Sequence, residues 1–141
     1  QGMNCGFEDC YELNKLIEIN GDDWDTTFRQ FSTSRPENTN AITDLAVENF
    51  VEMRDKVGDE SFLLRKKIEA HLNDLYPDMW IPQYSMVTFN PDMGYAEAMK
   101  IGKLQKKIMD EVMSVPDVTE NWQNLDFEMI MGDLKELLKK P

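Results

Sequence analysis

The sequence contains little cysteine or histidine: two cysteines and one histidine among 141 residues. Two cysteines are too few for a disulfide framework, and one histidine without a thiolate pair offers no ligand set for a transition metal. Cys5 and Cys10 stand on one expected helix at a spacing that points their side chains in different directions. We therefore expect two reduced cysteines, no metal site, and a surface position for His71, whose neighbours are charged.

The motifs that usually carry chemistry are also missing. The chain has no GxGxxG or Walker loop for phosphates, no HExxH and no CxxC. The loop NPDMGY has one aspartate and lacks the alternating oxygen ligands of a calcium loop. The ten methionines stand mostly at core spacing and indicate packing rather than a binding groove. The residues alone therefore identify no catalytic group.

Charge and hydropathy exclude two classes of partner. The chain carries 27 acidic and 15 basic residues, a formal net charge of −12, which repels phosphate backbones and leaves no basic stripe for nucleic acid. No apolar run approaches the roughly 20 residues that cross a bilayer, and no signal-peptide pattern is present. We expect a cytoplasmic protein that binds neither nucleic acid nor a membrane.

What the sequence does contain is helical periodicity, which predicts a mainly α fold of about six helices. Gly21 ends the first helix, and Trp24, Phe28 and Phe31 are expected to form the buried face of the second. Pro36 is expected to separate the second helix from the third. Further helices are predicted over 59–76, 95–113 and 127–140, with Asp59 as an N-cap and Pro116 as a break.

The segment around residues 80–89 breaks this periodicity. WIPQYSMVTF is rich in β-branched and aromatic residues and alternates in polarity, so the pattern predicts one extended segment. Tyr84 would then offer its hydroxyl at the edge of an apolar wall.

The predicted third helix contains a misplaced polar residue. Its apolar stripe includes Ile42, Leu45, Phe50 and Met53, and at about 100° per residue Asn49 falls in the middle of it. An unpaired buried amide costs on the order of 1–3 kcal/mol. Asn49 must therefore pair with another protein group or line a polar pocket, and the residues alone leave both open.

A second unusual feature is the triplet Gly2-Met3-Asn4, directly before the first predicted helix. The free N–H groups of a helix start can hold carbonyl or anionic oxygens of a ligand, although the triplet alone is a weak signal.

Four stretches, read in order, resemble the carboxy-terminal part of the kynurenine 3-monooxygenase family of FAD-dependent aromatic hydroxylases. They are QGMNCGFEDC, DLAVENFVEMRDKV, FLLRKKIE and YPDMWIPQYSMVTF. The first is shared by many flavoprotein hydroxylases, whereas ENFVEMR followed by IPQYSMVTF is specific to the kynurenine enzymes. The resemblance covers residues 1 to 110 and is weaker over 111 to 141.

The resemblance implies a reaction and a set of site residues. In this family, NADPH reduces FAD, and the flavin then uses O₂ to hydroxylate L-kynurenine to 3-hydroxykynurenine, a step of tryptophan degradation. Cofactor binding by Gly2, Met3 and Asn4 is implied by the family's flavin contact. Substrate binding is implied for Asn49, Tyr84, Glu52 and Met53. Asn49, Glu52 and Met53 share one helix face, at spacings i, i+3 and i+4.

The resemblance also implies what this chain lacks. The dinucleotide-binding strand and glycine loop, and the remaining carboxylate-binding residues, are not in it. We expect a fragment of a bacterial-type enzyme that is inactive without the N-terminal FAD-binding domain and self-associates through exposed apolar faces. Its expected regions are 1–20, the last helix of the FAD-binding domain; 21–115, the substrate pocket; and 116–141, a terminal amphipathic helix.

Two other readings remain open. The chain could be an autonomous acidic helical module that docks a partner protein, or part of a flavin hydroxylase with another aromatic substrate. The sequence upstream of Gln1 would separate the first from the enzyme reading, and turnover with kynurenine would decide the second.

Overall fold

The computed structural model describes residues 2–90 and 92–140, and these residues are mainly α-helical, as predicted, with no strand among them. The helices are α1 (Gly2–Asn20), α2 (Trp24–Asp55), α3 (Glu60–Leu75), α4 (Gln83–Phe89), α5 (Tyr95–Met113), α6 (Val118–Asn121) and α7 (Phe127–Leu138), with a short 3-10 helix η1 (Trp122–Asn124) before α7.

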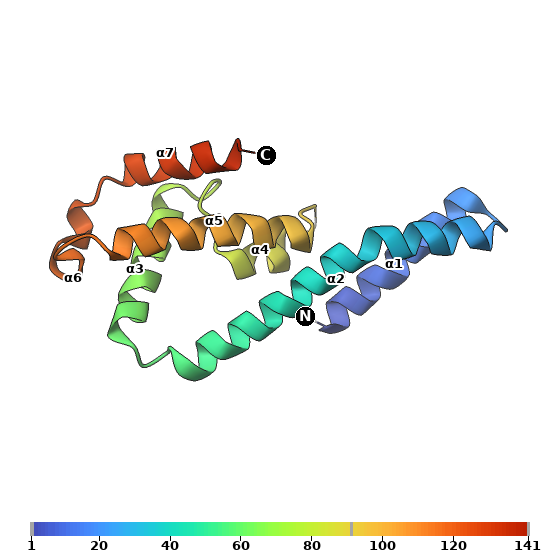
Figure 1. Ribbon diagram of the computed structural model, residues 1–141, viewed down its shortest axis with the longest axis horizontal. Coiled ribbons are helices and arrows are strands. Elements are labelled where there is room, and N and C mark those ends of the chain that lie inside the picture. Colours follow the sequence, from blue (N-terminus) through green and yellow to red (C-terminus); the bar gives the residue numbers. More distant parts are fainter. Residues whose placement is uncertain (1, 91, 141) are drawn as a thin grey trace.

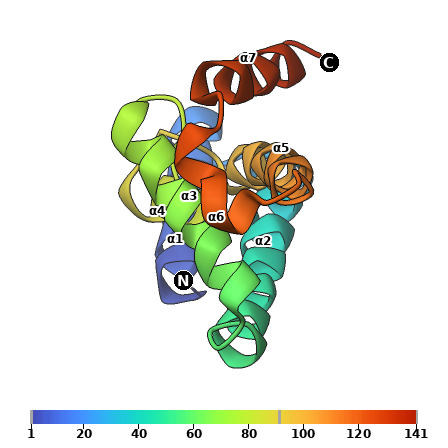
Figure 2. The same cartoon turned by 90° about the vertical axis from the view of Figure 1, so that its left-hand side faces the viewer.

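The helices form an elongated molecule with two halves joined by α5. α1 and α2 make a long antiparallel hairpin at one end, and α3, α6 and α7 surround the later part of α5 at the other (Figure 1). Seen along the long axis, α7 lies on one side of α5 and α2 on the other (Figure 2). No helix of the described residues is long and apolar enough to span a bilayer.

Two hydrophobic clusters stabilise this arrangement, and α5 contributes to both. Tyr95 and Met99, near its start, pack with Cys5 of α1 and with Ala41, Ile42 and Leu45 of α2. Ile108 and Val112, later on α5, belong to the second cluster and pack with α3, α7 and Trp80. Because one rigid helix crosses both clusters, it fixes the hairpin relative to the other half.

The ends of several helices follow local sequence signals. Gly21 adopts a positive φ of 59° and ends α1, a backbone conformation that favours glycine. Asp59 caps α3 by accepting a hydrogen bond from the Phe62 N–H at 2.8 Å, as predicted. Asp126 caps α7 in the same way, through the Met129 N–H at 2.9 Å.

The predicted break at Pro36 is wrong, because α2 runs without interruption from Trp24 to Asp55. A proline inside a helix removes one backbone hydrogen bond and costs about 3 kcal/mol. Here the Thr39 hydroxyl donates to the carbonyls of Arg35 and Pro36 at 3.2 and 3.3 Å. The packing of α1 along α2 stabilises the continuous helix further.

The predicted extended segment at 80–89 is also wrong, because Gln83–Phe89 forms the short helix α4. Pro82 stands at its N-cap, where its missing N–H costs nothing, and its carbonyl accepts from the N–H groups of Ser85 and Met86. Met86 is 1% exposed. Burial of this side chain against α5 outweighs the extended propensity of the β-branched and aromatic residues.

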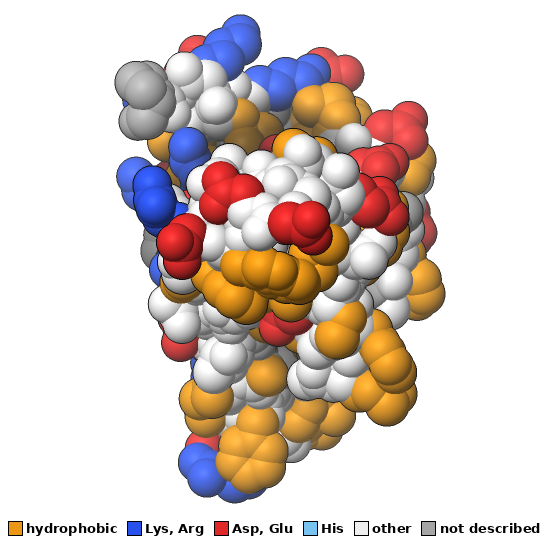
Figure 3. Space-filling view, turned by 90° about the vertical axis from the view of Figure 1, so that its right-hand side faces the viewer, with side chains coloured by type: hydrophobic (Ala, Val, Ile, Leu, Met, Phe, Trp, Pro, Cys, Tyr) orange, Lys and Arg blue, Asp and Glu red, His pale blue; other side chains and the backbone are white. Residues whose placement is uncertain are grey.

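Of the apolar face predicted at the start of α2, Phe31 is half-buried, whereas Trp24 and Phe28 are exposed. Trp24 and Phe28 are 49% and 54% exposed and contact each other with ring centroids 5.7 Å apart. Figure 3 faces the end of the molecule where α1 turns into α2, and it shows hydrophobic side chains among acidic ones. The hairpin projects beyond the rest of the chain, so nothing covers this face.

The stripe on the later half of α2 is only half buried. Ile42 and Leu45 are 4% and 3% exposed, whereas Phe50, Met53 and Val57 are between 48% and 65% exposed. The helix therefore leaves the core one turn after Leu45, and its last two turns carry uncovered apolar side chains.

His71 differs from its predicted surface position. It is half-buried, and its ring meets Trp122 and Phe127 edge-on, with centroids 5.6 and 4.9 Å apart. It therefore contributes to aromatic packing between α3, η1 and α7, which its charged sequence neighbours did not indicate.

Candidate functional site

A mostly apolar groove of about 540 Å³ lies between the first half of α1 and the middle of α2. Its α1 wall consists mainly of small residues, and residues from successive turns of α2 form the other wall. The lining residues are Gly2, Cys5, Gly6, Asp9, Thr39, Ile42, Thr43, Ala46, Val47 and Phe50. Because α1 and α2 are antiparallel, the start of α1 faces the later part of α2.

The predicted cofactor-binding triplet forms the first turn of α1. Gly2 lines the groove, and a Cβ atom placed on it would meet nothing within 4 Å. Met3 is 74% exposed, and Asn4 is exposed as well. The triplet thus forms an exposed first turn, and Gly2 places it against the groove.

Asn49, Glu52 and Met53, the predicted substrate-binding residues of α2, are not among the residues that line the groove. Asn49 is half-buried and directly precedes Phe50, which lines the groove. Glu52 Oε2 lies 3.8 Å from Lys66 Nζ of α3, so its carboxylate has a cation nearby. Met53 is exposed. Asn49 thus lies one residue along the chain from a groove wall to which Gly2 of the triplet also belongs.

Tyr84 lies on α4, which packs on α5. Gln105 Nε2 of α5 donates to the Ile81 carbonyl at 3.0 Å just before α4, and Val87 packs against the cluster that contains Tyr95 and Met99 of α5. α4 therefore runs antiparallel to α5. Tyr84 is not among the residues that line the groove. The Tyr84 side chain is 41% exposed.

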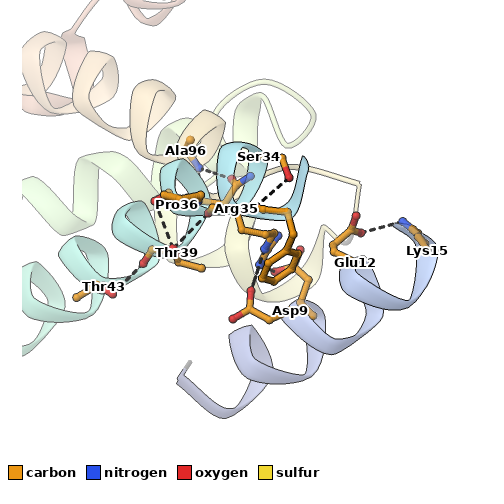
Figure 4. Close-up of polar contacts among 12 residues, drawn as sticks. Asp9, Glu12, Lys15, Ser34, Arg35, Pro36, Thr39, Thr43 and Ala96 are labelled. Atoms are coloured by element: carbon orange, nitrogen blue, oxygen red, sulfur yellow. Dashed lines mark hydrogen bonds and ion pairs between the residues drawn. The ribbon is translucent and has the colours of Figure 1, made fainter. Parts of the chain in front are cut away.

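One polar cluster beside the groove was not found from the sequence. Arg35 of α2 is 7% exposed, and its Nε donates to Asp9 Oδ1 at 2.8 Å while its Nη2 donates to Glu8 Oε2 at 3.2 Å (Figure 4). Burial disfavours the charged guanidinium, but the hydrogen bonds with Asp9 and Glu8 outweigh this and raise the pKa of Arg35. It therefore stays charged.

The same cluster changes the pKa of two neutral groups. Burial and a hydrogen bond with Glu8 raise the pKa of Tyr95 to about 12, so the phenol stays protonated and can donate to that carboxylate. Burial and the negative charge of Asp9 raise the pKa of the Cys5 thiol. The only sequence signal for this cluster was the pair Glu8-Asp9 on a helix that carries few other charges near its start.

A second, polar pocket of about 290 Å³ lies on the other side of Arg35, against the loop before α5. Asn38 Oδ1, one turn after Arg35, accepts from the Ala96 N–H at 3.0 Å and so joins α2 to the start of α5. The residues that line this polar pocket include Glu8, Glu12 and Asp92. Among residues 2–90 and 92–140, however, no three metal-ligating side chains are grouped closely enough to hold an ion.

No protein-family model matches the chain, but curated proteins do. It is 47% identical over 140 residues to the kynurenine 3-monooxygenase of Flavobacterium johnsoniae, an alignment that covers 99% of this chain and 30% of the relative. Against the enzyme of Cytophaga hutchinsonii the identity is 52% over 123 residues, 86% of this chain and 27% of the relative. The chain is similar to the carboxy-terminal part of kynurenine 3-monooxygenases.

The similarity extends beyond bacteria. The kynurenine 3-monooxygenase of Candida albicans is 42% identical over 112 residues, 79% of this chain and 25% of the relative. The chain thus spans about three tenths or less of the kynurenine 3-monooxygenases it matches. These relatives confirm the resemblance predicted from the four sequence stretches.

Proposed function

We propose that the chain is the carboxy-terminal part of a flavin-dependent kynurenine 3-monooxygenase. The observation that carries this proposal is the identity of 47–52% with two such enzymes over 86–99% of the chain. Two further observations support it. Gly2 of the predicted cofactor turn and Phe50, next to Asn49, both line the α1–α2 groove. Phe50 and Met53 are exposed, as expected where a further part of an enzyme packs.

The residues present fit a flavin ring. Gly2 leaves open space at the groove mouth, and the groove is mostly apolar. Gly2, Met3 and Asn4 would hold the ring in the complete enzyme, together with residues outside this chain. FAD, reduced by NADPH, would supply oxygen activation there. We propose residues 1–20 as part of the flavin-binding region.

The remaining residues would bind and orient L-kynurenine. Asn49 can donate and accept hydrogen bonds from a half-buried position, and the Tyr84 hydroxyl is a neutral donor suited to the substrate carboxylate. Glu52 and Met53 would line the outer part of the same pocket, with Glu52 held near Lys66. Residues 21–115 would form this pocket, and 116–141 would support it from the other side of α5. Together the side chains would exclude water from the reacting ring.

The test is turnover by the full-length protein that contains this chain. With NADPH, FAD and O₂, it should convert L-kynurenine to 3-hydroxykynurenine, whereas the isolated chain should neither bind FAD stoichiometrically nor turn over. Hydroxylation of another aromatic acid but not of kynurenine would support the flavin-dependent reaction and refute L-kynurenine as the substrate. A full-length protein without a flavin would reject the proposal and favour an interaction module.

A further inference from the structure

We propose that Arg35 is a positioning residue, which fixes the flavin-facing turn of α1 relative to the substrate-facing part of α2. This inference rests on the proposed function. Arg35 is the one buried charged side chain among the residues that the structure describes, and its side-chain hydrogen bonds go to Asp9 and Glu8 of α1. Its role would therefore be exerted through the two helices that it joins.

The reason for a directional contact lies in the groove itself. Many of the residues that line the groove are small or aliphatic, including Cys5, Gly6, Ile42 and Ala46. Contacts between such side chains are non-directional and do not by themselves fix how far one helix lies along the other. Arg35 makes two charge-assisted hydrogen bonds to Asp9 and Glu8, which define the register near the groove, as the hydrogen bonds of Asn20 to Thr27 and Gln30 do near the α1–α2 turn.

The position of the cluster makes this register matter for the site. Asp9 lies on the same face of α1 as Gly2 and Cys5, and all three line the groove. A slip of α1 by one turn would move its first turn by about 5.4 Å along α2. That distance would separate the Gly2-Met3-Asn4 turn from the level of Asn49, and a bound substrate would no longer face the flavin.

The cluster also holds α5 at the same level. Tyr95 of α5 lies close enough to Glu8 for this carboxylate to raise the pKa of the phenol, and Asn38 accepts from the Ala96 N–H at 3.0 Å. The Arg35–Asn38 segment of α2 therefore fixes both α1 and the start of α5. Since α4 packs on α5, Tyr84 is placed indirectly from the same segment.

An arginine suits this role better than a lysine. The guanidinium donates from separate nitrogens to two adjacent carboxylates, whereas an ammonium group is a point charge on a flexible stem. Arg35→Lys would keep the charge and lose the pair of hydrogen bonds to Asp9 and Glu8, and Arg35→Met would lose both the charge and the hydrogen bonds. Glu8→Gln would keep the shape of the side chain and weaken only the hydrogen bond between Arg35 and position 8. Arg29→Met, at an exposed position six residues earlier on α2, is the matched control.

The experiment uses the full-length protein with FAD bound, and its main readout is the coupling ratio, the moles of 3-hydroxykynurenine formed per mole of NADPH consumed. Melting temperature, flavin-to-protein ratio and kcat per bound flavin are measured beside it. We expect Arg35→Met and Arg35→Lys to lower the coupling ratio at least twofold and kcat per bound flavin at least fivefold. Glu8→Gln should show a smaller loss in the same direction, and Arg29→Met no change.

The possible outcomes separate the two proposals. If Arg35→Met does not fold or retain flavin, Arg35→Lys and Glu8→Gln decide. Wild-type coupling and wild-type kcat in every flavin-loaded variant would overturn the positioning role, even if the melting temperature falls, because a structural ion pair would change stability alone. If the unmodified protein does not hydroxylate kynurenine at all, the proposed function fails before this inference is reached.

Discussion

The side chain of Gln83 occupies the space that a side chain at position 102 would need. A Cβ atom placed on Gly102 would lie 2.2 Å from Gln83 Cδ and 2.3 Å from Gln83 Nε2. Glycine at this position therefore allows the start of α4 to pack directly on α5. Because Tyr84 directly follows Gln83, the contact between Gln83 and Gly102 also helps to fix the position of Tyr84 on the first turn of α4.

This contact predicts opposite effects of Gly102→Ala in two backgrounds. In the unmodified chain the new methyl group must displace Gln83, and we expect the free energy of unfolding to fall by about 1 kcal/mol. In a Gln83→Ala background the clash is gone. There the higher helix propensity of alanine should make Gly102→Ala raise the free energy of unfolding by about 0.5–1 kcal/mol. Urea unfolding of the four proteins tests this, and equal effects in both backgrounds would refute it.

The raised pKa of Tyr95 predicts a loss of stability at high pH. Below about pH 10 the phenol is protonated in the folded and unfolded states, so its contribution is fully present. As the pH rises toward the folded pKa of about 12, the unfolded state loses the proton first, and stability falls. Between about pH 10 and pH 12 we expect the free energy of unfolding of Tyr95→Phe to fall by about 2 kcal/mol less than that of the unmodified chain.

The measurement for Tyr95 is urea unfolding at a series of pH values up to 12. Tyr11→Phe, at a position 61% exposed, is the control and should follow the unmodified chain. A constant difference between Tyr95→Phe and the unmodified chain across the series would contradict the shift.

The two cysteines should differ in reactivity. Cys10 is exposed, whereas Cys5 is buried, and its thiol pKa is raised by burial and by Asp9. Because the thiolate is the reactive form, we expect Cys5 to react with a thiol reagent at neutral pH at least about tenfold more slowly than Cys10. Cys10→Ser should remove the fast phase, and unfolding in urea should make both thiols react alike. Two equal rates in the folded chain would contradict this.

The C-terminal helix should contribute to stability as part of the core. Leu134 of α7 is 0% exposed and packs in the cluster with Ile68, Ile108 and Trp80. Leu134→Ala should lower the free energy of unfolding by about 2–5 kcal/mol through the cavity it leaves. Glu136→Ala, on the exposed face of the same helix, should change it by less than about 0.5 kcal/mol. Similar small effects of both substitutions would show that α7 does not stabilise the fold.

Signals that act within one helical turn predicted the structure well. The cap at Asp59 and the helix end at Gly21 each depend on neighbouring residues of one element, so their sequence pattern was sufficient. Where tertiary packing decides, the same reasoning failed. α4 forms because Met86 is buried against α5, and α2 continues through Pro36 because α1 packs along it.

The candidate site shows the same division. The position of Asn49 within an apolar stripe indicated a polar role, and the family resemblance gave it a ligand. Neither could show that Phe50 and Met53 are exposed beside it, because a stripe does not reveal which part of it meets the core. The contact between Arg35 and Asp9 was equally hidden, since it depends on the antiparallel register of two helices.

The account rests on substrate binding by the Asn49 segment, and one titration tests it most directly. L-kynurenine is added to the full-length, FAD-loaded protein, and its Kd is measured from the change in flavin absorbance. If Asn49 hydrogen-bonds the substrate, Asn49→Ala should raise Kd by about 10-fold, the equivalent of about 1.4 kcal/mol. Asn40→Ala, at an exposed position on α2, should leave it unchanged. An unchanged Kd in Asn49→Ala would contradict the account.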